Sequence, residues 1–329
     1  MEDLASIVQT NQLSNTLIPS QLLPATDEVD EYLMATHGKT FHFAARFLSP
    51  RLRCHIVTLY AFFRTLDDLV DAPPASRNSN DIRKELADWR LWFTENHVFP
   101  APRESLGMHL AALLDEHRIP TAIFLDFLDG MSTDMDFQEI QDFQGMYRYC
   151  YRVAGTVGLA MTHMLGVRSP QALEAAEKLG IGMQLTNILR DVGGDLAAGR
   201  IYLPLEDLAR FDCSPTHLYQ LYREQQGPDE RFRALMRYQV ARAHRYFVSG
   251  MSGVWLLPAD CRLPILLAGR LYRRILIEIE RKDYDVLRAR AATSTPEKIR
   301  EAAIAFTLDR LWRRGEMFSA TVGGVFLED

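Results

Sequence analysis

One short segment of the chain carries an arginine and aspartates at the spacing of a helix face. It runs over residues 60–71 (YAFFRTLDDLVD). Because an α-helix turns by about 100° per residue, Arg64, Asp67 and Asp71 fall on one face and Asp68 lies beside them. Like charges one turn apart destabilise an isolated helix, so helix stability does not explain this pattern. Paired carboxylates of this kind are suited to binding a metal ion.

A second segment, residues 184–195 (QLTNILRDVGGD), presents side-chain oxygens along one face. Gln184, Asn187, Asp191 and Asp195 follow one another at steps of three, four and four residues. Apolar residues fill the remaining positions, so we expect this polar face to belong to a helix that is otherwise buried.

Two buried carboxylate-bearing helices that face each other repel unless cations lie between them. Magnesium takes oxygen ligands and is normally held by one or two carboxylates together with phosphate oxygens. We therefore predict a cavity whose opposite walls carry Asp67/Asp71 and Asp191/Asp195, bridged to diphosphate by Mg²⁺ or, alternatively, Mn²⁺. An exposed acidic helix face explains either segment alone equally well, and the presence of both favours the metal site.

The elements that position these faces are predicted to be helices. Apolar residues recur at helical spacing along most of the chain, and no alternating β-branched stretch bounded by turns is evident, so the predicted fold class is all-α. Helix starts are expected at Ser49-Pro50, Ser169-Pro170 and Thr295-Pro296, where a capping oxygen precedes a proline in the first turn.

The chain punctuation predicts one helical domain. Breaks are expected at residues 72–80 (APPASRNSN) and 225–228 (QQGP), both too short for interdomain linkers. Residues 1–27 are polar and weakly periodic, so we expect a loosely ordered N-terminal arm ahead of a domain spanning 28–329.

Composition excludes several classes of protein. A formal net charge of -6 over 329 residues argues against a nucleic-acid binder. The four cysteines are dispersed and form no CxxC pair, which disfavours a zinc site built on cysteines or a disulfide framework. The N-terminal segment lacks the features of a secretory signal, and no apolar run reaches ~18 residues. We expect a cytoplasmic protein, at most peripheral on the inner face of the membrane.

Both acidic segments resemble those of the squalene/phytoene synthase family of head-to-head trans-prenyl transferases, and the chain is most like the bacterial phytoene synthases. The resemblance runs from about His37 to Arg290. The segments that carry it are 37–41 (HGKTF), 60–71, 149–158 (YCYRVAGTVG), 184–204, Tyr272 and 284–286 (YDV). It implies an isoprenoid-synthase-type helical bundle around a central cavity.

The resemblance also implies roles for individual residues. The implied metal ligands are Asp67, Asp71, Asn187, Asp191 and Asp195. The implied diphosphate-binding residues are Arg64, Arg190, Arg200, Gln184, Asn187 and Tyr202. The four aspartates are implied to act in catalysis together with His37, Tyr149 and Tyr272. The implied wall of the prenyl channel consists of Phe41, Val153, Ala154, Val157 and Gly158.

Simpler interpretations of these residues remain open. Arg64 can merely form a salt bridge with Asp67, which contributes little at a surface. His37 can be a capping or core histidine, and Tyr149 and Tyr272 can be half-buried tyrosines with satisfied hydroxyls. The small residues near Gly158 can serve close helix packing alone.

Two positions depart from the family pattern. Gly194 stands where the family usually has an acidic residue next to the last aspartate. Ala289 stands where the family commonly has an arginine, although Arg288 and Arg290 flank it. The first departure affects support of the metal ligands, and the second affects phosphate binding.

The predicted reaction is head-to-head condensation of two allylic prenyl diphosphates, with release of diphosphate. The resemblance favours geranylgeranyl diphosphate as substrate and phytoene as product, through a cyclopropylcarbinyl diphosphate. Squalene or dehydrosqualene formation from farnesyl diphosphate is the alternative, with NADPH needed only for squalene, and a presqualene or hydroxysqualene product is also open. A non-catalytic scaffold of the same fold and a terpene cyclase are further alternatives. A downstream desaturase is an implied partner.

Overall fold

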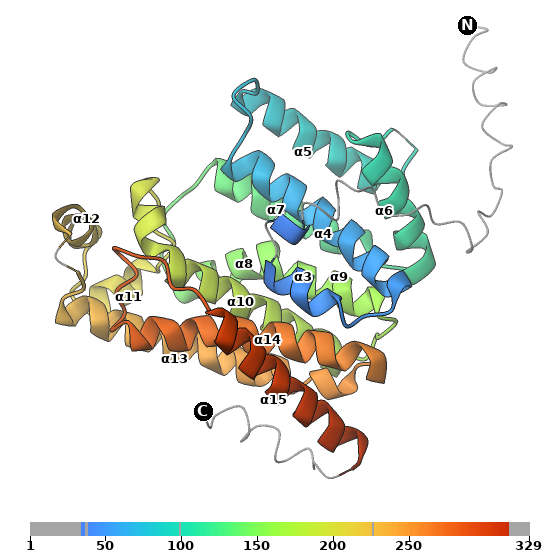
Figure 1. Cartoon of the computed structure of the whole chain (residues 1–329). Coiled ribbons are helices and arrows are strands. Elements are labelled where there is room, and N and C mark those ends of the chain that lie inside the picture. Colours follow the sequence, from blue (N-terminus) through green and yellow to red (C-terminus); the bar gives the residue numbers. More distant parts are fainter. Residues whose placement is uncertain (1–33, 37–38, 99, 226, 316–329) are drawn as a thin grey trace, which may run out of the picture.

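The computed structural model describes residues 34–36, 39–98, 100–225 and 227–315, and this part of the chain is helical, without a β-strand. The prediction of an all-α fold is confirmed (Figure 1). The first half contains α3 (Lys39–Ala45), α4 (Pro50–Asp71), α5 (Ser79–Thr94), α6 (Glu104–His117), α7 (Thr121–Met135), α8 (Phe143–Cys150) and α9 (Thr156–Met164). The second contains α10 (Pro170–Ala197), α11 (Leu205–Arg210), α12 (Pro215–Glu224), α13 (Glu230–Met251), α14 (Ala259–Arg281) and α15 (Thr295–Arg313).

Two of the three predicted helix starts are confirmed. Ser49 and Ser169 cap α4 and α10, each accepting a hydrogen bond from a backbone N–H of the first turn. The third was misplaced by one residue, because Ser294 rather than Thr295 caps α15. Ser294 forms a capping box in which the Glu297 carboxylate accepts from the Ser294 backbone N–H, and this satisfies two otherwise unpaired donors.

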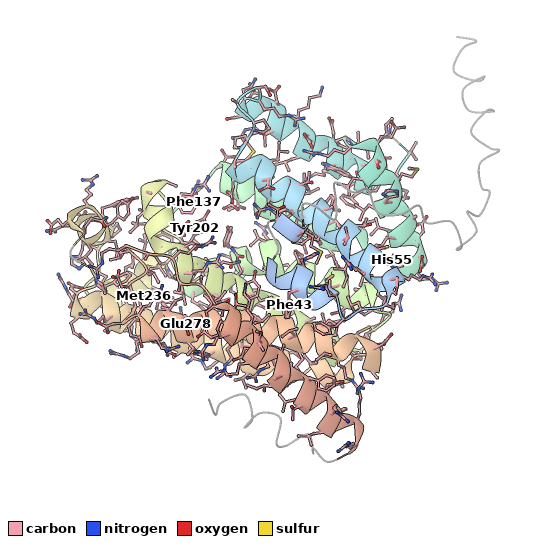
Figure 2. All side chains as sticks on the ribbon, viewed as in Figure 1. Phe43, His55, Phe137, Tyr202, Met236 and Glu278 are labelled. Carbon is pink, nitrogen blue, oxygen red and sulfur yellow. The ribbon has the colours of Figure 1, made fainter. Side chains whose placement is uncertain are left out.

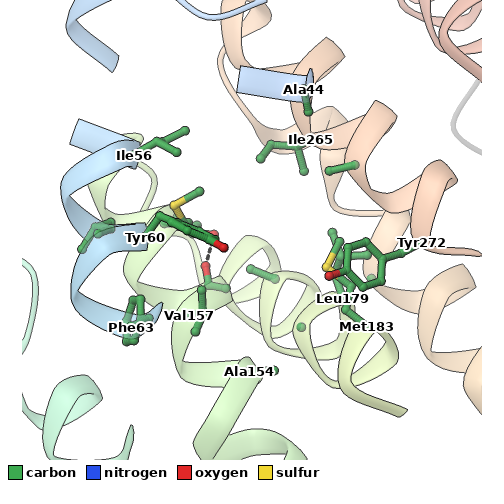
Figure 3. A pocket seen from close by; sticks show the side chains of 18 of the residues that line it. Ala44, Ile56, Tyr60, Phe63, Ala154, Val157, Leu179, Met183, Ile265 and Tyr272 are labelled. Carbon is green, nitrogen blue, oxygen red and sulfur yellow. Dashed lines mark hydrogen bonds between the residues drawn. The ribbon is translucent and has the colours of Figure 1, made fainter. Parts of the chain in front are cut away.

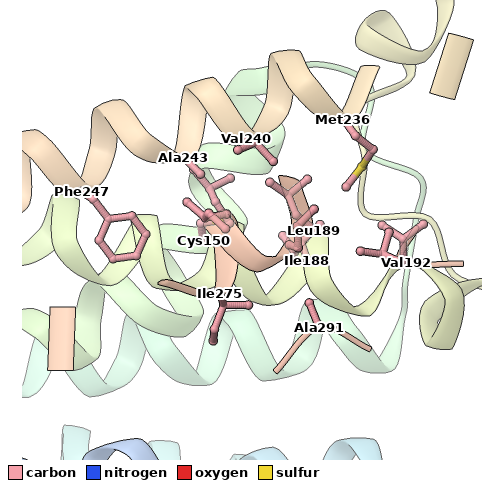
Figure 4. Close-up of a cluster of buried hydrophobic side chains, with 14 of the residues drawn as sticks. Cys150, Ile188, Leu189, Val192, Met236, Val240, Ala243, Phe247, Ile275 and Ala291 are labelled. Atoms are coloured by element: carbon pink, nitrogen blue, oxygen red, sulfur yellow. The ribbon is translucent and has the colours of Figure 1, made fainter. Parts of the chain in front are cut away.

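The buried apolar side chains form two clusters, one built mainly by helices of the first half of the chain and the other mainly by helices of the second half. In the first half, the rings of Phe62, Trp89 and Phe124 pack edge to face, with centroids 5.2 and 5.4 Å from that of Phe62. In the second half, α13 packs along α10, as the close-up of Val240 and Ile188 shows (Figure 4). The two long acidic segments belong to different clusters: 60–71 lies on α4 and 184–195 on α10.

Small residues let the chain between these clusters approach α10 closely. A Cβ atom on Gly158 would lie 2.4 Å from the Ala176 carbonyl oxygen, and one on Gly180 would lie 2.3 Å from that of Ala154. Close helix packing, one of the two interpretations left open in the sequence analysis, is therefore one role of the small residues near Gly158. The five residues Tyr151–Gly155 form a π-helix between α8 and α9, which the sequence did not predict.

None of the helices in the described ranges has the length and apolar character needed to cross a membrane. Residues 1–27, predicted as an N-terminal arm, lie outside the described residues, so the proposed division at residue 28 stays a prediction.

Candidate active site

An apolar pocket of about 310 Å³ lies between the two clusters. Its walls come from α4, from the π-helix and α9, from α10 and from α14, as Ile56, Val157, Leu179 and Ile265 illustrate (Figure 3). Four of the predicted channel residues line it: Val153, Ala154, Val157 and Gly158. The fifth, Phe41, belongs to α3, but its side chain lies outside the described part of the structure, as does His37.

Polar side chains enter this pocket from two facing walls. Arg64 and Asp67 line it from α4, and Gln184 and Asn187 line it from α10, with Tyr272 of α14 beside them. The structure therefore brings together residues more than a hundred positions apart that were assigned to one site from their spacing.

On α4, the carboxylates of Asp67, Asp68 and Asp71 each accept a hydrogen bond from an arginine. Arg64 donates to Asp68 through Nε at 3.0 Å and to Asp67 through Nη1 at 3.1 Å. Asp71 accepts from Nη1 of Arg200, which follows α10, at 3.2 Å. The salt bridge between Arg64 and Asp67 anticipated from the sequence is thus present, and Arg200 reaches the first acidic face from the segment that follows the second.

On α10, Asp191 accepts hydrogen bonds from two arginines. Arg190 donates to both of its oxygens at 2.9 and 2.7 Å, and Arg290 donates to the same oxygens at 2.6 and 2.8 Å. Asn187 donates through Nδ2 to Gln184 at 3.1 Å, whereas its Oδ1 atom is buried with no hydrogen-bond partner among the described residues.

The pKa values of the aspartates follow these contacts. Burial, followed by repulsion from Asp71, raises the pKa of Asp67 to about 7. Burial, followed by repulsion from Asp191 and Asp71, raises the pKa of Asp195 to about 7. Burial also disfavours the charged form of Asp191, but hydrogen bonds from Arg190 and Arg290 outweigh it and lower its pKa. The effect of Asp71 on Asp195 shows that the two faces lie within electrostatic reach.

These residues fit divalent cations bound with a diphosphate. The donor set consists of carboxylate and amide oxygens, which Mg²⁺ prefers, and the unsatisfied Oδ1 of Asn187 offers a ready ligand. The raised pKa values of Asp67 and Asp195 mark an excess of negative charge that cations relieve. Among the described residues, no three aspartate oxygens of the site lie within 4.8 Å of one another. The set therefore suits ions bridged by substrate oxygens better than one ion enclosed by protein.

Comparison with known proteins identifies the family. The sequence profile of squalene/phytoene synthase matches residues 34–297. This chain belongs to the squalene/phytoene synthase family. Members of the family are prenyl transferases, and the all-helical fold described above is shared with a solved dehydrosqualene synthase.

Individual relatives cover most of the chain. A 15-cis-phytoene synthase of Synechocystis sp. is 35% identical over 291 residues, which cover 85% of this chain and 84% of the relative. A phytoene synthase of Arthrospira platensis is 36% identical over 305 residues, covering 88% and 95%. The crystal structure of a dehydrosqualene synthase in complex with ligand is similar with a TM-score of 0.76 at 30% identity, covering 85% of this chain and 95% of that one.

Sequence reasoning missed Asp134 of α7, which joins two predicted tyrosines of this prenyl transferase. Its carboxylate accepts from the hydroxyls of Tyr149 at 3.1 Å and Tyr202 at 3.0 Å. The two tyrosine rings stack with centroids 5.1 Å apart, and Phe137 packs on Tyr202 (Figure 2). Asp134 is 6% exposed, and burial raises its pKa to about 6. No sequence signal singled it out, because α7 carries three aspartates, Asp126, Asp129 and Asp134.

Tyr60, the first residue of the acidic segment 60–71, was given no role from the sequence, and the structure places it in the pocket wall opposite Tyr272 (Figure 3). Burial raises the pKa of Tyr60 to about 12, and it also raises the pKa of Tyr272. Both hydroxyls therefore stay protonated at neutral pH, as hydrogen-bond donors facing the apolar space.

The two departures from the family pattern have different outcomes. Arg290, next to Ala289, reaches Asp191, whereas Arg288 pairs with Asp285 instead. Arg290 is thus the flanking arginine that lies at the site. Gly194 is exposed, and a Cβ atom there would meet nothing within 4 Å.

Proposed function

We propose that this chain is a phytoene synthase, which joins two molecules of geranylgeranyl diphosphate head to head through a cyclopropylcarbinyl diphosphate and releases diphosphate. The observation that carries the proposal is an apolar pocket whose polar end is formed by two facing aspartate-bearing helices. The phytoene synthase relatives at 35% and 36% identity support geranylgeranyl diphosphate as the substrate.

The proposed site holds diphosphate at its polar end. Asp67, Asp71, Asp191, Asp195 and Asn187 are the residues that would bind Mg²⁺. When bound, Mg²⁺ supplies positive charge that stabilises the departing diphosphate. The arginines contribute charge-assisted hydrogen bonds to phosphate oxygens, and Arg64, Arg190, Arg200 and Arg290 are the ones within reach of the aspartates.

The apolar part of the pocket would protect the reaction from water. Loss of diphosphate leaves an allylic cation, which side chains such as Phe63 and Val157 surround without offering a nucleophile. The double bond of the second prenyl chain then attacks this cation, and loss of one proton closes the ring of the cyclopropylcarbinyl diphosphate. Departure of the second diphosphate, rearrangement and loss of a second proton would give phytoene. Tyr149 and Tyr202 already donate their hydroxyl protons to Asp134, so they would position this carboxylate beside the acidic faces rather than donate to substrate or take part as anions.

Squalene or dehydrosqualene formation from farnesyl diphosphate is the second candidate. It is favoured by the structural similarity to a dehydrosqualene synthase at 30% identity. A squalene-forming enzyme would need NADPH, whereas phytoene and dehydrosqualene form by loss of a proton.

Incubation of the purified chain with geranylgeranyl or farnesyl diphosphate, with and without MgCl₂ and NADPH, tests the proposal by mass spectrometry of the hydrocarbon. We expect phytoene from the C20 substrate, no dependence on NADPH, and no product in excess EDTA. A C30 product from farnesyl diphosphate alone would establish the second candidate. Absence of any condensation product under all conditions would support a non-catalytic scaffold.

We also propose peripheral contact with a lipid surface for release of the apolar product, which a downstream desaturase would take up. Phe47 and Leu256 are 46% and 50% exposed, and each precedes a residue of the pocket wall, Leu48 or Leu257. Flotation with liposomes tests this contact. We expect the wild type to float and the Phe47→Ser, Leu256→Ser double variant to remain at the bottom, and an entirely unbound wild type would contradict the proposal.

A further inference from the structure

A second group of metal-ligating side chains lies near the other end of α4. His55 is in its second turn, and Glu116 and His117 are the last residues of α6. Nδ1 of His55 lies 2.9 Å from Nε2 of His117, which is 3.3 Å from Oε1 of Glu116. Ligand atoms of the three residues all lie within 4.8 Å of one another, the only such group of three or more His, Cys, Asp or Glu in the described part of the chain.

The hydrogen bonds of this group leave one buried atom unsatisfied. His55 is 3% exposed, and only its Nδ1 atom takes part in the contact with His117. Its Nε2 atom is buried without a hydrogen-bond partner among the described residues and faces Oε2 of Glu116 at 3.9 Å. A buried polar nitrogen without a partner is unfavourable in either tautomer, whereas a bound cation would use its lone pair. The same ion can bind His117 only by replacing the hydrogen bond between the two rings, so that each imidazole gives it one lone pair.

The residue types of this group agree with this role. Neutral imidazoles together with one carboxylate are ligands that zinc and similar transition metals prefer, unlike the oxygen set of the diphosphate site.

We propose that His55, Glu116 and His117 bind one divalent transition-metal ion, zinc or a similar ion. Two imidazoles and a carboxylate leave one position of a tetrahedral site to water. Arg51 donates to Oε1 of Glu116 at 2.5 Å, and it can keep this oxygen while Oε2 binds the ion. Arg168 donates to the backbone carbonyl of His117 at 2.6 Å and thereby fixes the end of α6.

The ion would join α6 to α4 and act on the stability of this half of the molecule. His55 precedes Asp67 by twelve residues, which is roughly 18 Å along a helix. The proposed ion is therefore separate from the diphosphate-bound ions, and its loss is expected to change thermal stability more than the chemical step.

Titration with Co²⁺ in excess MgCl₂ tests the proposal, because Mg²⁺ occupies oxygen sites and competes poorly for imidazole. We expect one Co²⁺ per chain with visible absorption bands of a nitrogen- and oxygen-ligated ion. The variants His117→Gln and Glu116→Gln, which change partly exposed residues, should each weaken Co²⁺ binding at least about tenfold. Zn²⁺ should raise the melting temperature of the wild type and not that of these variants.

Two controls distinguish this site from others. His244 lies 3.9 Å from Glu280 without a second histidine, so His244→Ala should bind Co²⁺ as the wild type does. Asp67→Asn should also retain it, because that aspartate belongs to the diphosphate site. Unchanged Co²⁺ binding in both His117→Gln and Glu116→Gln, or no bound Co²⁺ in the wild type, would overturn the proposal.

Discussion

The two acidic faces each carry two aspartates but differ in their balance of charge. On α4, Asp67 shares Arg64 with Asp68 and has a pKa near 7. On α10, Asp191 is held by two arginines and its pKa is lowered. The difference shows that arginines, one of them from a distant segment, decide which carboxylate is ionised before substrate binds. Asp191 is ionised and its charge is balanced by two arginines, whereas Asp67 and Asp195 need a cation to balance theirs.

The first prediction removes one carboxylate from each face. Asp67→Asn and Asp191→Asn should each lower turnover at least about a thousandfold, because several kcal/mol of stabilisation of the departing diphosphate depend on both faces. Release of diphosphate from geranylgeranyl diphosphate provides the assay. Asp283→Asn is a matched control. Asp283 does not line the pocket and forms an ion pair of 2.6 Å with Arg233, so this variant should be fully active. Full activity in either site variant would remove the assigned role.

The second prediction concerns Asp134, which raises the pKa of both Asp67 and Asp195. Its own pKa is raised by burial from 3.8 to about 6, so the folded state binds its proton more tightly than the unfolded state does. Its contribution to stability is therefore present below pH 4 and lost as the pH rises through 6, by roughly 3 kcal/mol.

Urea unfolding of wild type and Asp134→Asn in EDTA, from pH 4 to pH 8, measures this contribution. The variant should gain stability relative to the wild type as the pH rises, because its amide does not ionise. A difference between the two proteins that is constant with pH would show that Asp134 does not titrate in this range.

The third prediction removes one of the two arginines that bind Asp191. Arg290→Gln should lower kcat/KM about tenfold, because it removes charge-assisted hydrogen bonds from a partly exposed site that also binds phosphate. Arg288→Gln is the matched control: Arg288 lies two residues away and pairs with Asp285, so its loss should leave kcat/KM within about twofold. Equal effects of the two substitutions would place Arg290 outside the site.

The fourth prediction compares adjacent glycines of α10. A Cβ atom on Gly193 would lie 2.5 Å from the Leu287 carbonyl oxygen, so Gly193→Ala should push away the loop that carries Arg290 and destabilise the protein by about 1–3 kcal/mol. Gly194→Ala meets nothing within 4 Å and should stabilise the helix by about 0.5–1 kcal/mol. Thermal unfolding of both variants checks the contrast, and a similar effect at the two positions would contradict it.

What the sequence predicted well depends on local geometry. The turn of a helix places Asp67 and Asp71 on one face whatever surrounds them, and the caps at Ser49 and Ser169 depend on neighbouring backbone groups. The error at Ser294 was also local, because the Ser-x-x-Glu capping box outweighed the preference for proline directly after the cap.

Contacts between distant segments could not be predicted in this way. Arg290 lies 99 residues from Asp191, and Asp134 lies 68 residues from Tyr202. No periodicity links such positions, since they meet only when separate helices pack. The pairing of His55 with His117 has the same origin and went unnoticed in the sequence.

Binding of a non-reactive geranylgeranyl thiodiphosphate in the presence of Mn²⁺ tests most directly whether both acidic faces hold the diphosphate through shared cations. Calorimetry should show that the analogue and Mn²⁺ strengthen each other's binding in the wild type, and that Asp67→Asn and Asp191→Asn each abolish this coupling. Analogue binding that is as tight in EDTA as in Mn²⁺, or coupling that survives in either variant, would contradict the account.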